Sequence, residues 1–308
     1  MTTEYQTDTA TGDGWALHLG DSCEVLRGLA DKSVDLTCYS PPFASLYTYS
    51  DSLRDMGNSK SRREFFDHYS FVIRELFRVT KPGRISAVHV SDVALSKAVQ
   101  GYMGLYDFPG DVIRAHKRAG WIFYGRALVD KNPQAQAIRT KSHALMFVTK
   151  NRDSSATRPA IGDHLLVFKK PGTNAVRIKT DVTNDEWIEW ARPIWKGLSD
   201  EETVAAMERE GLVPAPGWYG VNETRTLNHR SARGERDEKH ICPLQLDFIE
   251  RCVRLWSNKG ETVLSPFAGV GSEVYTAVKL GRRGIGIELK PSYFRTAIEN
   301  VKGVTKSP

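Results

Sequence analysis

The sequence has few cysteines and no long apolar run. Its 308 residues contain four cysteines, Cys23, Cys38, Cys242 and Cys252, with no CxxC pair and no zinc spacing. We therefore expect free thiols in a reducing cytoplasm, and neither a disulfide framework nor a metal site. No stretch approaches the roughly 18 consecutive apolar residues of a membrane span. The polar segment 1–13 lacks the apolar core of a secretory signal, and we interpret it as a frayed tail.

The sequence also lacks a strong excess of charge of either sign. Its formal net charge is +6, and its 26% charged and 40% hydrophobic residues are ordinary for a globular protein. The length suffices for one large or two medium domains with a proper core. A basic surface suits a nucleic-acid partner, because Lys and Arg neutralise phosphates. Net charge alone does not identify such a partner, since many basic proteins bind no DNA.

Strand-like and helix-like segments alternate along the chain, which is typical of an α/β fold with a doubly wound, mostly parallel sheet. Residues 44–60 are expected to form a long loop, and residues 151–239 an insertion whose apolar periodicity is weak. The core of this insertion is expected to contain Trp187, Trp190, Trp195 and Trp218. The predicted strands are 15–19, 33–39, 84–90, 121–129, 144–149, 261–264 and 284–288, and the predicted helices are 22–29, 63–79, 107–119, 243–256, 272–280 and 293–302.

The predicted strand 33–39 ends abruptly at Ser40-Pro41-Pro42-Phe43. Two consecutive prolines cannot continue a strand ladder, so the chain turns there. A Ser hydroxyl and a backbone carbonyl held by the prolines can accept hydrogen bonds from the amino group of an extruded base, and so direct its nitrogen lone pair toward a methyl donor. Phe43 offers a flat face on which the base can stack. The simpler alternative is a Pro-Pro turn beside a core Phe.

A glycine turn in the last part of the chain indicates a nucleoside ligand. Residues 263–271 run from a strand through Gly269 and Gly271 into a helix, and glycines let the backbone approach a ligand closely. The next strand ends at Glu288, whose carboxylate can accept hydrogen bonds from both ribose hydroxyls. The third glycine of the dinucleotide fingerprint is missing, which favours a cofactor without phosphates, such as S-adenosylmethionine. The alternative is a plain glycine turn with a solvated strand end.

Together these segments resemble the amino-group DNA methyltransferases of the β order, in which the catalytic motif precedes the cofactor glycine motif. Ser265 departs from the family pattern, because an Asp is usual there, and Ser272-Glu273 stands where Thr or Ser pairs are common. Six segments match the family in order: 20–22, 33–43, 131–143, 240–245, 264–272 and 286–288.

The resemblance implies a Rossmann-like, S-adenosylmethionine-dependent fold with a catalytic domain at 1–150 and 240–308 and a target-recognition region at 151–239. It implies that S-adenosyl-L-homocysteine is the product and that no metal takes part. It assigns catalysis to Ser40, Pro41, Pro42 and Phe43. It assigns cofactor binding to Asp21, Ser40, His240, Cys242, Pro243, Ser265, Phe267, Gly269, Gly271, Ser272 and Glu288.

The resemblance also implies double-stranded DNA as the partner. The basic run 222–239 can contact phosphates and read guanine, although a charge run can equally be a solvated surface. We expect His68, His89 and His116 to be packing or surface residues. We expect neither His143 nor His240 to be a general base, because a neutral amino nucleophile needs no prior deprotonation. The predicted DNA-binding residues are Tyr47, Tyr49, Arg62, Arg63, Lys131, Asn132, Arg139, Arg225, Arg230, Arg233 and Arg236.

Several alternatives stay open at this level. The target is adenine N6, slightly favoured by the residues that follow Phe43, or cytosine N4, which Ser before Pro-Pro favours. An RNA methyltransferase and an inactive DNA-binding relic are the other classes. We expect a homodimer on a palindromic site, with helices 63–79 and 107–119 at its interface unless they simply cover the sheet. The expected location is the cytoplasm of a bacterial or phage-infected cell.

Overall fold

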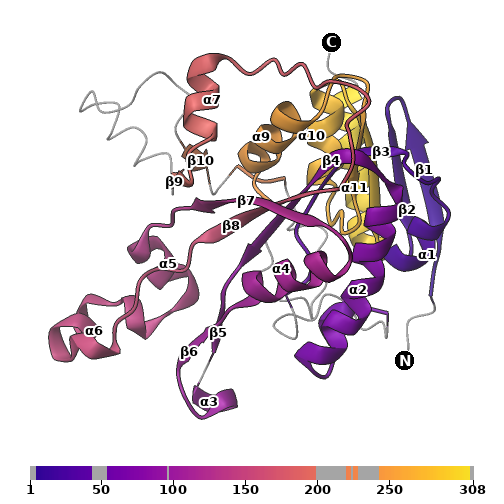
Figure 1. Cartoon of the computed structure of the whole chain (residues 1–308). Coiled ribbons are helices and arrows are strands. Elements are labelled where there is room, and N and C mark those ends of the chain that lie inside the picture. Colours follow the sequence, from indigo (N-terminus) through magenta and orange to yellow (C-terminus); the bar gives the residue numbers. More distant parts are fainter. Residues whose placement is uncertain are drawn as a thin grey trace.

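The computed structural model describes residues 5–43, 54–95, 97–198, 220–222, 225–227 and 243–305. They form a ten-stranded sheet with helices on both faces and a separate two-stranded hairpin (Figure 1). The strand order across the large sheet is β1-β2-β12-β11-β3-β4-β8-β7-β9-β10. The bounds are β1 Asp8–Gly12, β2 Trp15–Leu19, β3 Val34–Tyr39, β4 Thr80–Ser91, β7 Ile122–Val129, β8 Asp163–Lys169, β9 Ile194–Leu198, β10 Gly220–Asn222, β11 Thr262–Ser265 and β12 Arg283–Glu288.

The centre of the sheet is parallel. β2, β12, β11, β3 and β4 run in one direction, whereas β8 is antiparallel to both of its neighbours, β4 and β7. β3 lies beside β11, with Leu36 opposite Val263. From this pair the chain winds in opposite directions, β3 through α2 (Arg62–Val79) to β4 and β11 through α10 (Ser272–Lys279) to β12. In doubly wound sheets, ligands bind at the carboxyl ends of strands where the winding reverses.

Helices cover both faces of the sheet. The remaining larger helices are α1 Ser22–Arg27, α4 Phe108–Arg118, α7 Asn184–Trp190, α9 Leu246–Trp256 and α11 Pro291–Thr305. Successive strand residues point to opposite faces, so Tyr39 packs in the core with α2 and α4, while Cys38 packs in the core with α9 and α10. The Ser61 side chain begins α2 by accepting a hydrogen bond from the Glu64 N–H. This arrangement confirms the predicted doubly wound α/β fold.

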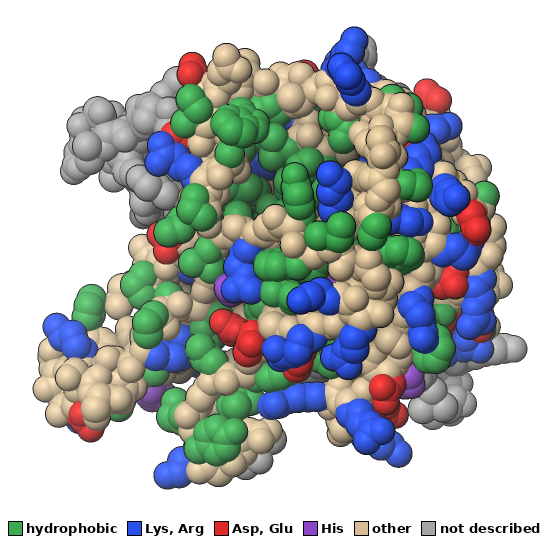
Figure 2. Space-filling view, in the orientation of Figure 1, with side chains coloured by type: hydrophobic (Ala, Val, Ile, Leu, Met, Phe, Trp, Pro, Cys, Tyr) green, Lys and Arg blue, Asp and Glu red, His purple; other side chains and the backbone are tan. Residues whose placement is uncertain are grey.

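Two arms project from the body of the molecule (Figures 1 and 2). One is the β5–β6 hairpin with α3, and the other is the α5–α6 unit between β7 and β8. Both carry exposed apolar side chains, among them Met103 at 65% and Ile138 at 79% exposure. The bounds are β5 Val93–Leu95, α3 Lys97–Gln100, β6 Gly104–Tyr106, α5 Pro133–Thr140, η2 His143–Leu145, α6 Phe147–Arg152 and η3 Ser154–Ala156, with η1 at Met56–Asn58.

The interpretation of residues 1–13 as a frayed tail is wrong for the described part of that segment. Residues 8–12 form β1, which pairs along its whole length with β2, from Asp8 opposite Leu19 to Gly12 opposite Trp15. All its side chains except Ala10 are exposed, because β1 is an edge strand that contributes little to the core. Such a strand has the polar composition of a tail, so its sequence carries no apolar signal.

The predicted strand 144–149 is also wrong, because that segment forms η2 and the start of α6. The Phe147 side chain there is 63% exposed. The strand that completes this part of the sheet is β8, which lies between β4 and β7 with Leu166 and Phe168 fully buried. The predicted domain boundary at residue 150 therefore cuts the sheet, because it assigns β8 to the insertion 151–239.

The aromatic and helical predictions are met in part. Trp190 and Trp195 are buried as expected, Trp187 is 54% exposed, and Trp218 lies outside the described residues. The apolar faces of α2 and α4 pack against the sheet. This agrees with the alternative expectation, that these helices cover the sheet.

Three cysteines, Cys23, Cys38 and Cys252, carry free thiols, and Cys242 lies outside the described residues. Within the described part of the chain, no helix is both long and apolar enough to cross a bilayer.

Candidate active site

A cavity of about 560 Å³ opens at the carboxyl ends of the central strands. Its walls come from the ends of β3, β4, β11 and β12, which are adjacent in the sheet although β3 and β12 lie far apart in sequence. The cavity therefore unites the two halves of the predicted site. The predicted residues in its lining are Asp21, Ser40, Pro41, Pro42, Phe43, Pro243, Phe267, Gly269, Ser272 and Glu288.

The two glycines of the turn after β11 have different roles. Gly269 has φ 53°, and a Cβ built on it would meet nothing within 4 Å, so its backbone borders open space at the cavity. Gly271, which we expected at the cofactor, does not belong to the lining. Its φ is 87°, and a Cβ there would lie 3.0 Å from the Cβ of Ala297 in α11. Gly271 thus lets α10 and α11 approach each other, whereas Gly269 leaves open space at the cavity wall.

Glu288 occupies the end of β12, as predicted. Its two carboxylate oxygens accept hydrogen bonds from the backbone N–H groups of Gly269 and Lys290, both at 2.8 Å. Burial raises the pKa of Glu288 to about 7, although these N–H groups act in the opposite direction. The carboxyl group is held in a fixed orientation at the cavity wall, as an acceptor for ligand hydroxyls must be.

A second carboxyl, which the sequence analysis treated only as a departure from the family pattern, belongs to the same wall. Glu273 lies in the first turn of α10, is 4% exposed and lines the cavity. Burial raises its pKa to about 8, and the charge of Glu288 adds to the effect. At neutral pH Glu273 is therefore mostly an uncharged acid that can donate a hydrogen bond.

Two hydroxyls of the glycine motif are buried. Ser265, which replaces the usual Asp, is fully buried and does not reach the cavity, whereas Ser272 lines it. Neither Oγ atom has a hydrogen-bond partner within the described residues. The Ser272 hydroxyl is thus available to a ligand. Of the predicted cofactor residues in segment 240–245, His240 and Cys242 lie outside the described residues, and Pro243 lines the cavity.

Asp21 also lines the cavity. Its Oδ1 caps α1 by accepting hydrogen bonds from the N–H groups of Cys23 and Glu24. Its Oδ2 lies 3.7 Å from Arg54, whose guanidinium also pairs with Glu24 and stacks over the ring of Tyr5 at 4.1 Å. The Tyr5 hydroxyl accepts the Asp21 N–H at 2.9 Å. Asp21 is thus held by Tyr5, which precedes α1 in the chain, and by Arg54, which follows it.

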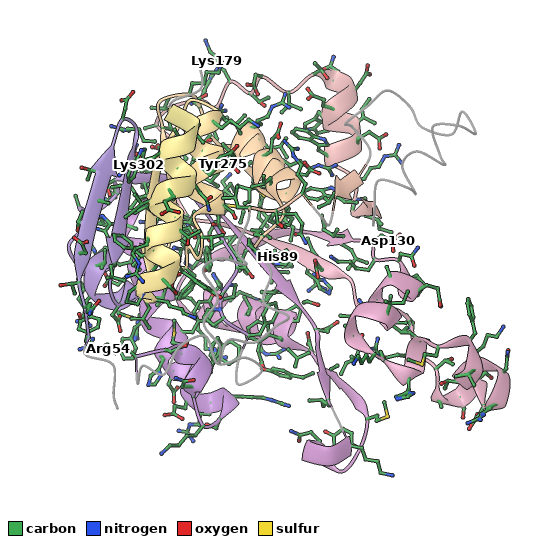
Figure 3. All side chains as sticks on the ribbon, turned by 180° about the vertical axis from the view of Figure 1, so that it is seen from behind. Arg54, His89, Asp130, Lys179, Tyr275 and Lys302 are labelled. Carbon is green, nitrogen blue, oxygen red and sulfur yellow. The ribbon has the colours of Figure 1, made fainter. Side chains whose placement is uncertain are left out.

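Ser40 follows β3 directly, and its hydroxyl faces a histidine that the sequence analysis assigned to packing. The Ser40 Oγ lies 3.4 Å from Nδ1 of His89, which β4 places deep in the molecule (Figure 3). The Nε2 of His89 is 3.1 Å from Asp163 in β8, and Asp163 contacts Lys131 at 2.8 Å. Phe43 packs near Phe108, with ring centroids 5.6 Å apart. The cavity lining therefore includes Ser40, His89 and Asp163 beside the Pro-Pro turn, and Lys131, outside the lining, extends this chain through Asp163.

Several of the predicted DNA-binding residues that the structure describes have contacts within the protein. Arg62 and Arg63 are both exposed, and the Arg62 guanidinium lies over the ring of Tyr106 at 3.8 Å. Asn132 caps α5. Lys131 contacts Asp163, and the Lys131 side chain is 12% exposed. Arg225 pairs with Asp247 and is 42% exposed. Tyr47, Tyr49, Arg230, Arg233, Arg236 and the side chain of Arg139 lie outside the described part.

The chain matches known DNA methylases over most of its length. A family model described as DNA methylase, of the N6 and N4 methyltransferase type, matches residues 34–299. The type II β methyltransferase M.BslI of Bacillus sp. (strain NEB-606) is 23% identical over 93% of this chain, which spans 28% of that relative's length. The type II methyltransferase M.MjaI of Methanocaldococcus jannaschii is 22% identical, with 90% of this chain and 87% of the relative aligned.

Solved structures share the fold. A candidate DNA modification methylase from Thermus thermophilus, in complex with S-adenosyl-L-methionine, superposes with a TM-score of 0.66 at 22% identity, covering 95% of both chains. Because the family model covers far more than half of the sequence, the resemblance found in the sequence is confirmed. The chain belongs to the family of N6/N4 amino-group DNA methyltransferases, with its catalytic motif ahead of its cofactor motif.

Proposed function

We propose that this protein methylates the exocyclic amino nitrogen of a base flipped out of double-stranded DNA. Its methyl donor is S-adenosyl-L-methionine, which leaves as S-adenosyl-L-homocysteine. One observation carries the proposal: a single cavity joins Ser40 at the end of β3 to Glu288 at the end of β12. Family membership supports the chemistry, and the related fold from Thermus thermophilus that binds this cofactor supports its identity.

The residues of the cavity wall fit the cofactor. The Glu288 carboxylate, held by two backbone N–H groups, would accept hydrogen bonds from the ribose hydroxyls. Gly269 leaves room for the ligand, and the Ser272 hydroxyl offers a further polar contact. The un-ionised Glu273 adds no full negative charge near neutral pH, which avoids strong repulsion from Glu288.

The other end of the cavity fits the base. The Ser40 hydroxyl and the adjoining backbone carbonyl would accept hydrogen bonds from the amino group and direct its lone pair toward the methyl donor. Phe43, partly buried beside Phe108, would support one face of the ring. Both adenine N6 and cytosine N4 present such an amino group, and adenine remains our slight preference.

DNA would lie against the cavity mouth and the two arms. We propose target recognition for residues 151–239 outside the strands β8, β9 and β10, which this region contributes to the ten-stranded sheet. A homodimer on a short palindromic site remains part of the proposal, in the cytoplasm where bacterial DNA lies. Such a dimer requires a surface other than the apolar faces of α2 and α4. Light scattering with and without DNA would measure the assembly.

A labelled-methyl assay tests the activity. We expect label to enter unmethylated genomic DNA and not RNA, and digestion to nucleosides would show N6-methyladenine or N4-methylcytosine. Ser40→Ala should abolish most incorporation while cofactor binding persists. The matched control is Ser70→Ala, whose hydroxyl donates to the Asp67 carbonyl within α2. Label in RNA alone, or full activity of Ser40→Ala, would contradict the proposal.

A further inference from the structure

Four polar side chains form a continuous chain that leads away from the proposed reaction centre. Ser40 Oγ lies 3.4 Å from His89 Nδ1, and His89 Nε2 lies 3.1 Å from Asp163 Oδ2. The same Asp163 oxygen is 2.8 Å from Lys131 Nζ. Methyl transfer as described above uses only Ser40, so the other three groups have no assigned role.

The chain is built into the sheet. Its members come from the ends of three adjacent strands, β3, β4 and β8, and from the residue pair after β7. His89 is 8% exposed, and its ring packs edge-on against Phe248 of α9, with centroids 5.0 Å apart. The side chains of Asp163 and Lys131 are 14% and 12% exposed. Groups so shielded from water keep their charges only with partners.

The electrostatics of the chain suit a transient positive charge on His89. Burial alone would raise the pKa of Asp163, but the neighbouring His89 and Lys131 hold it below the usual range. The aspartate is therefore a carboxylate at neutral pH, and it would stabilise an imidazolium next to it. The His89–Asp163 contact is close but not aligned as a regular hydrogen bond, which is common before a substrate is bound.

Amino methylation produces a proton that must leave. The neutral amino nitrogen forms a bond to the methyl carbon as the bond from that carbon to the sulfonium sulfur breaks and its electron pair stays on sulfur. The nitrogen becomes a cationic methylammonium group bearing two hydrogens. We propose that His89 is a positioning residue that takes this proton through Ser40. The Ser40 hydroxyl passes its own proton to His89 Nδ1 and receives one from the methylated nitrogen, so the base ends neutral and His89 becomes imidazolium beside Asp163. This inference rests on the proposed methyltransferase function.

The relay predicts that His89 must be neutral before transfer. The titratable groups that face it are Asp163 in β8 and, through Asp163, Lys131; the neighbouring pair is His164 with Asp92 at 3.8 Å. Of these groups, His164 is the second imidazole, and burial lowers its pKa. A His164→Gln variant therefore separates its contribution to any pH profile from that of His89.

The experiment is single-turnover methyl transfer to genomic DNA, measured against pH, in the unsubstituted protein and in His89→Gln, Asp163→Asn and Ser40→Ala. We expect a rate that rises with pH in the parent, and in His89→Gln a rate lower by about 100-fold that no longer rises. Calorimetry should find cofactor binding retained. Because residues of one relay act as a unit, Ser40→Ala/His89→Gln should be no slower than Ser40→Ala alone. His18→Gln in β2, whose ring contacts Thr9, is the matched control and should behave like the parent.

The possible outcomes are distinct. A His89→Gln protein that keeps the parental rate, or a lower rate with the parental pH profile, would show that His89 only packs or orients. If the rate losses of Ser40→Ala and His89→Gln multiplied in the double variant, the relay would likewise be overturned. Thermal unfolding of each variant excludes misfolding as the cause of a loss, and Asp163→Asn supplies a second variant if His89→Gln unfolds. Failure of the parent to methylate DNA would overturn the proposed function and the relay together.

Discussion

The carboxyl group of Glu288 accepts the backbone N–H of Gly269 at 2.8 Å, which ties the end of β12 to the glycine turn after β11. The two segments thereby hold each other at the cavity wall, and a ligand that bonds to the carboxylate meets a backbone already fixed in place. Since the N–H groups of Gly269 and Lys290 account for one acceptor site on each oxygen, further lone pairs remain for ligand hydroxyls.

Glu288→Ala should weaken S-adenosyl-L-methionine binding by about 1.5–3 kcal/mol, the scale of hydrogen bonds to a charged group. Calorimetry on the folded variant measures the loss. Glu299→Gln, at an exposed position of α11, is the control and should bind as the parent does. Equal affinity of Glu288→Ala and the parent would remove Glu288 from the cofactor site.

The same carboxyl predicts a pH dependence of cofactor affinity. Burial raises the pKa of Glu288 to about 7, so the group gains a proton as the pH falls below neutrality and loses acceptor strength. Affinity should therefore be weaker at pH 6 than at pH 8. Calorimetry at both values tests this, and Glu288→Gln should bind with an affinity that no longer follows pH in this window.

Glu273 predicts an effect on stability of definite sign. Its pKa in the folded protein is raised to about 8 by burial, so between the ordinary carboxyl range and pH 8 the folded state binds more protons than the unfolded state. The free energy of unfolding should therefore fall as the pH rises through this window. Denaturation by urea at pH 5, 7 and 9 measures the slope. Glu273→Gln should be less pH-sensitive than both the parent and Glu299→Gln.

The two glycines of the turn after β11, both with positive φ, allow binding to be separated from stability. Gly271→Ala should lower the free energy of unfolding by about 1–3 kcal/mol, because φ is 87° and Ala297 lies in the way. Gly269→Ala has open space around the new methyl group, so it should be the milder change for the fold and the larger change for cofactor affinity. Urea denaturation measures the stability of both variants, and calorimetry measures their cofactor affinity. If Gly271→Ala alone lost cofactor binding, the roles assigned to the two glycines would be reversed.

The sequence was sufficient to predict the strand ends that carry Ser40 and Glu288, because each lies within a local pattern: an apolar run followed by prolines, or a strand after a glycine turn. His89 and Asp163 could not be found in this way. Their partnership depends on β8 entering the sheet antiparallel to β4, and β8 lies in a region of weak periodicity. The edge strand β1 was missed because its exposed side chains resemble a tail. Local signals thus predicted the strand ends, and long-range pairing determined which side chains meet.

The last prediction concerns DNA. Binding should weaken as salt rises, because phosphate contacts release counterions. Arg230, Arg233 and Arg236 fall in the region that we propose for target recognition, and replacing all three with Gln should reduce the slope of log affinity against log salt by up to about 2.7 for B-DNA, which is about 0.9 for each phosphate that is no longer neutralised. Fluorescence anisotropy over about 50–200 mM salt measures this slope. Lys179→Gln/Lys302→Gln is the control, because Figure 3 places both residues at the end of the molecule opposite Arg54. A salt slope that changes in the control and not in the triple variant would place the DNA-binding surface at that opposite end, away from the cavity that contains Ser40.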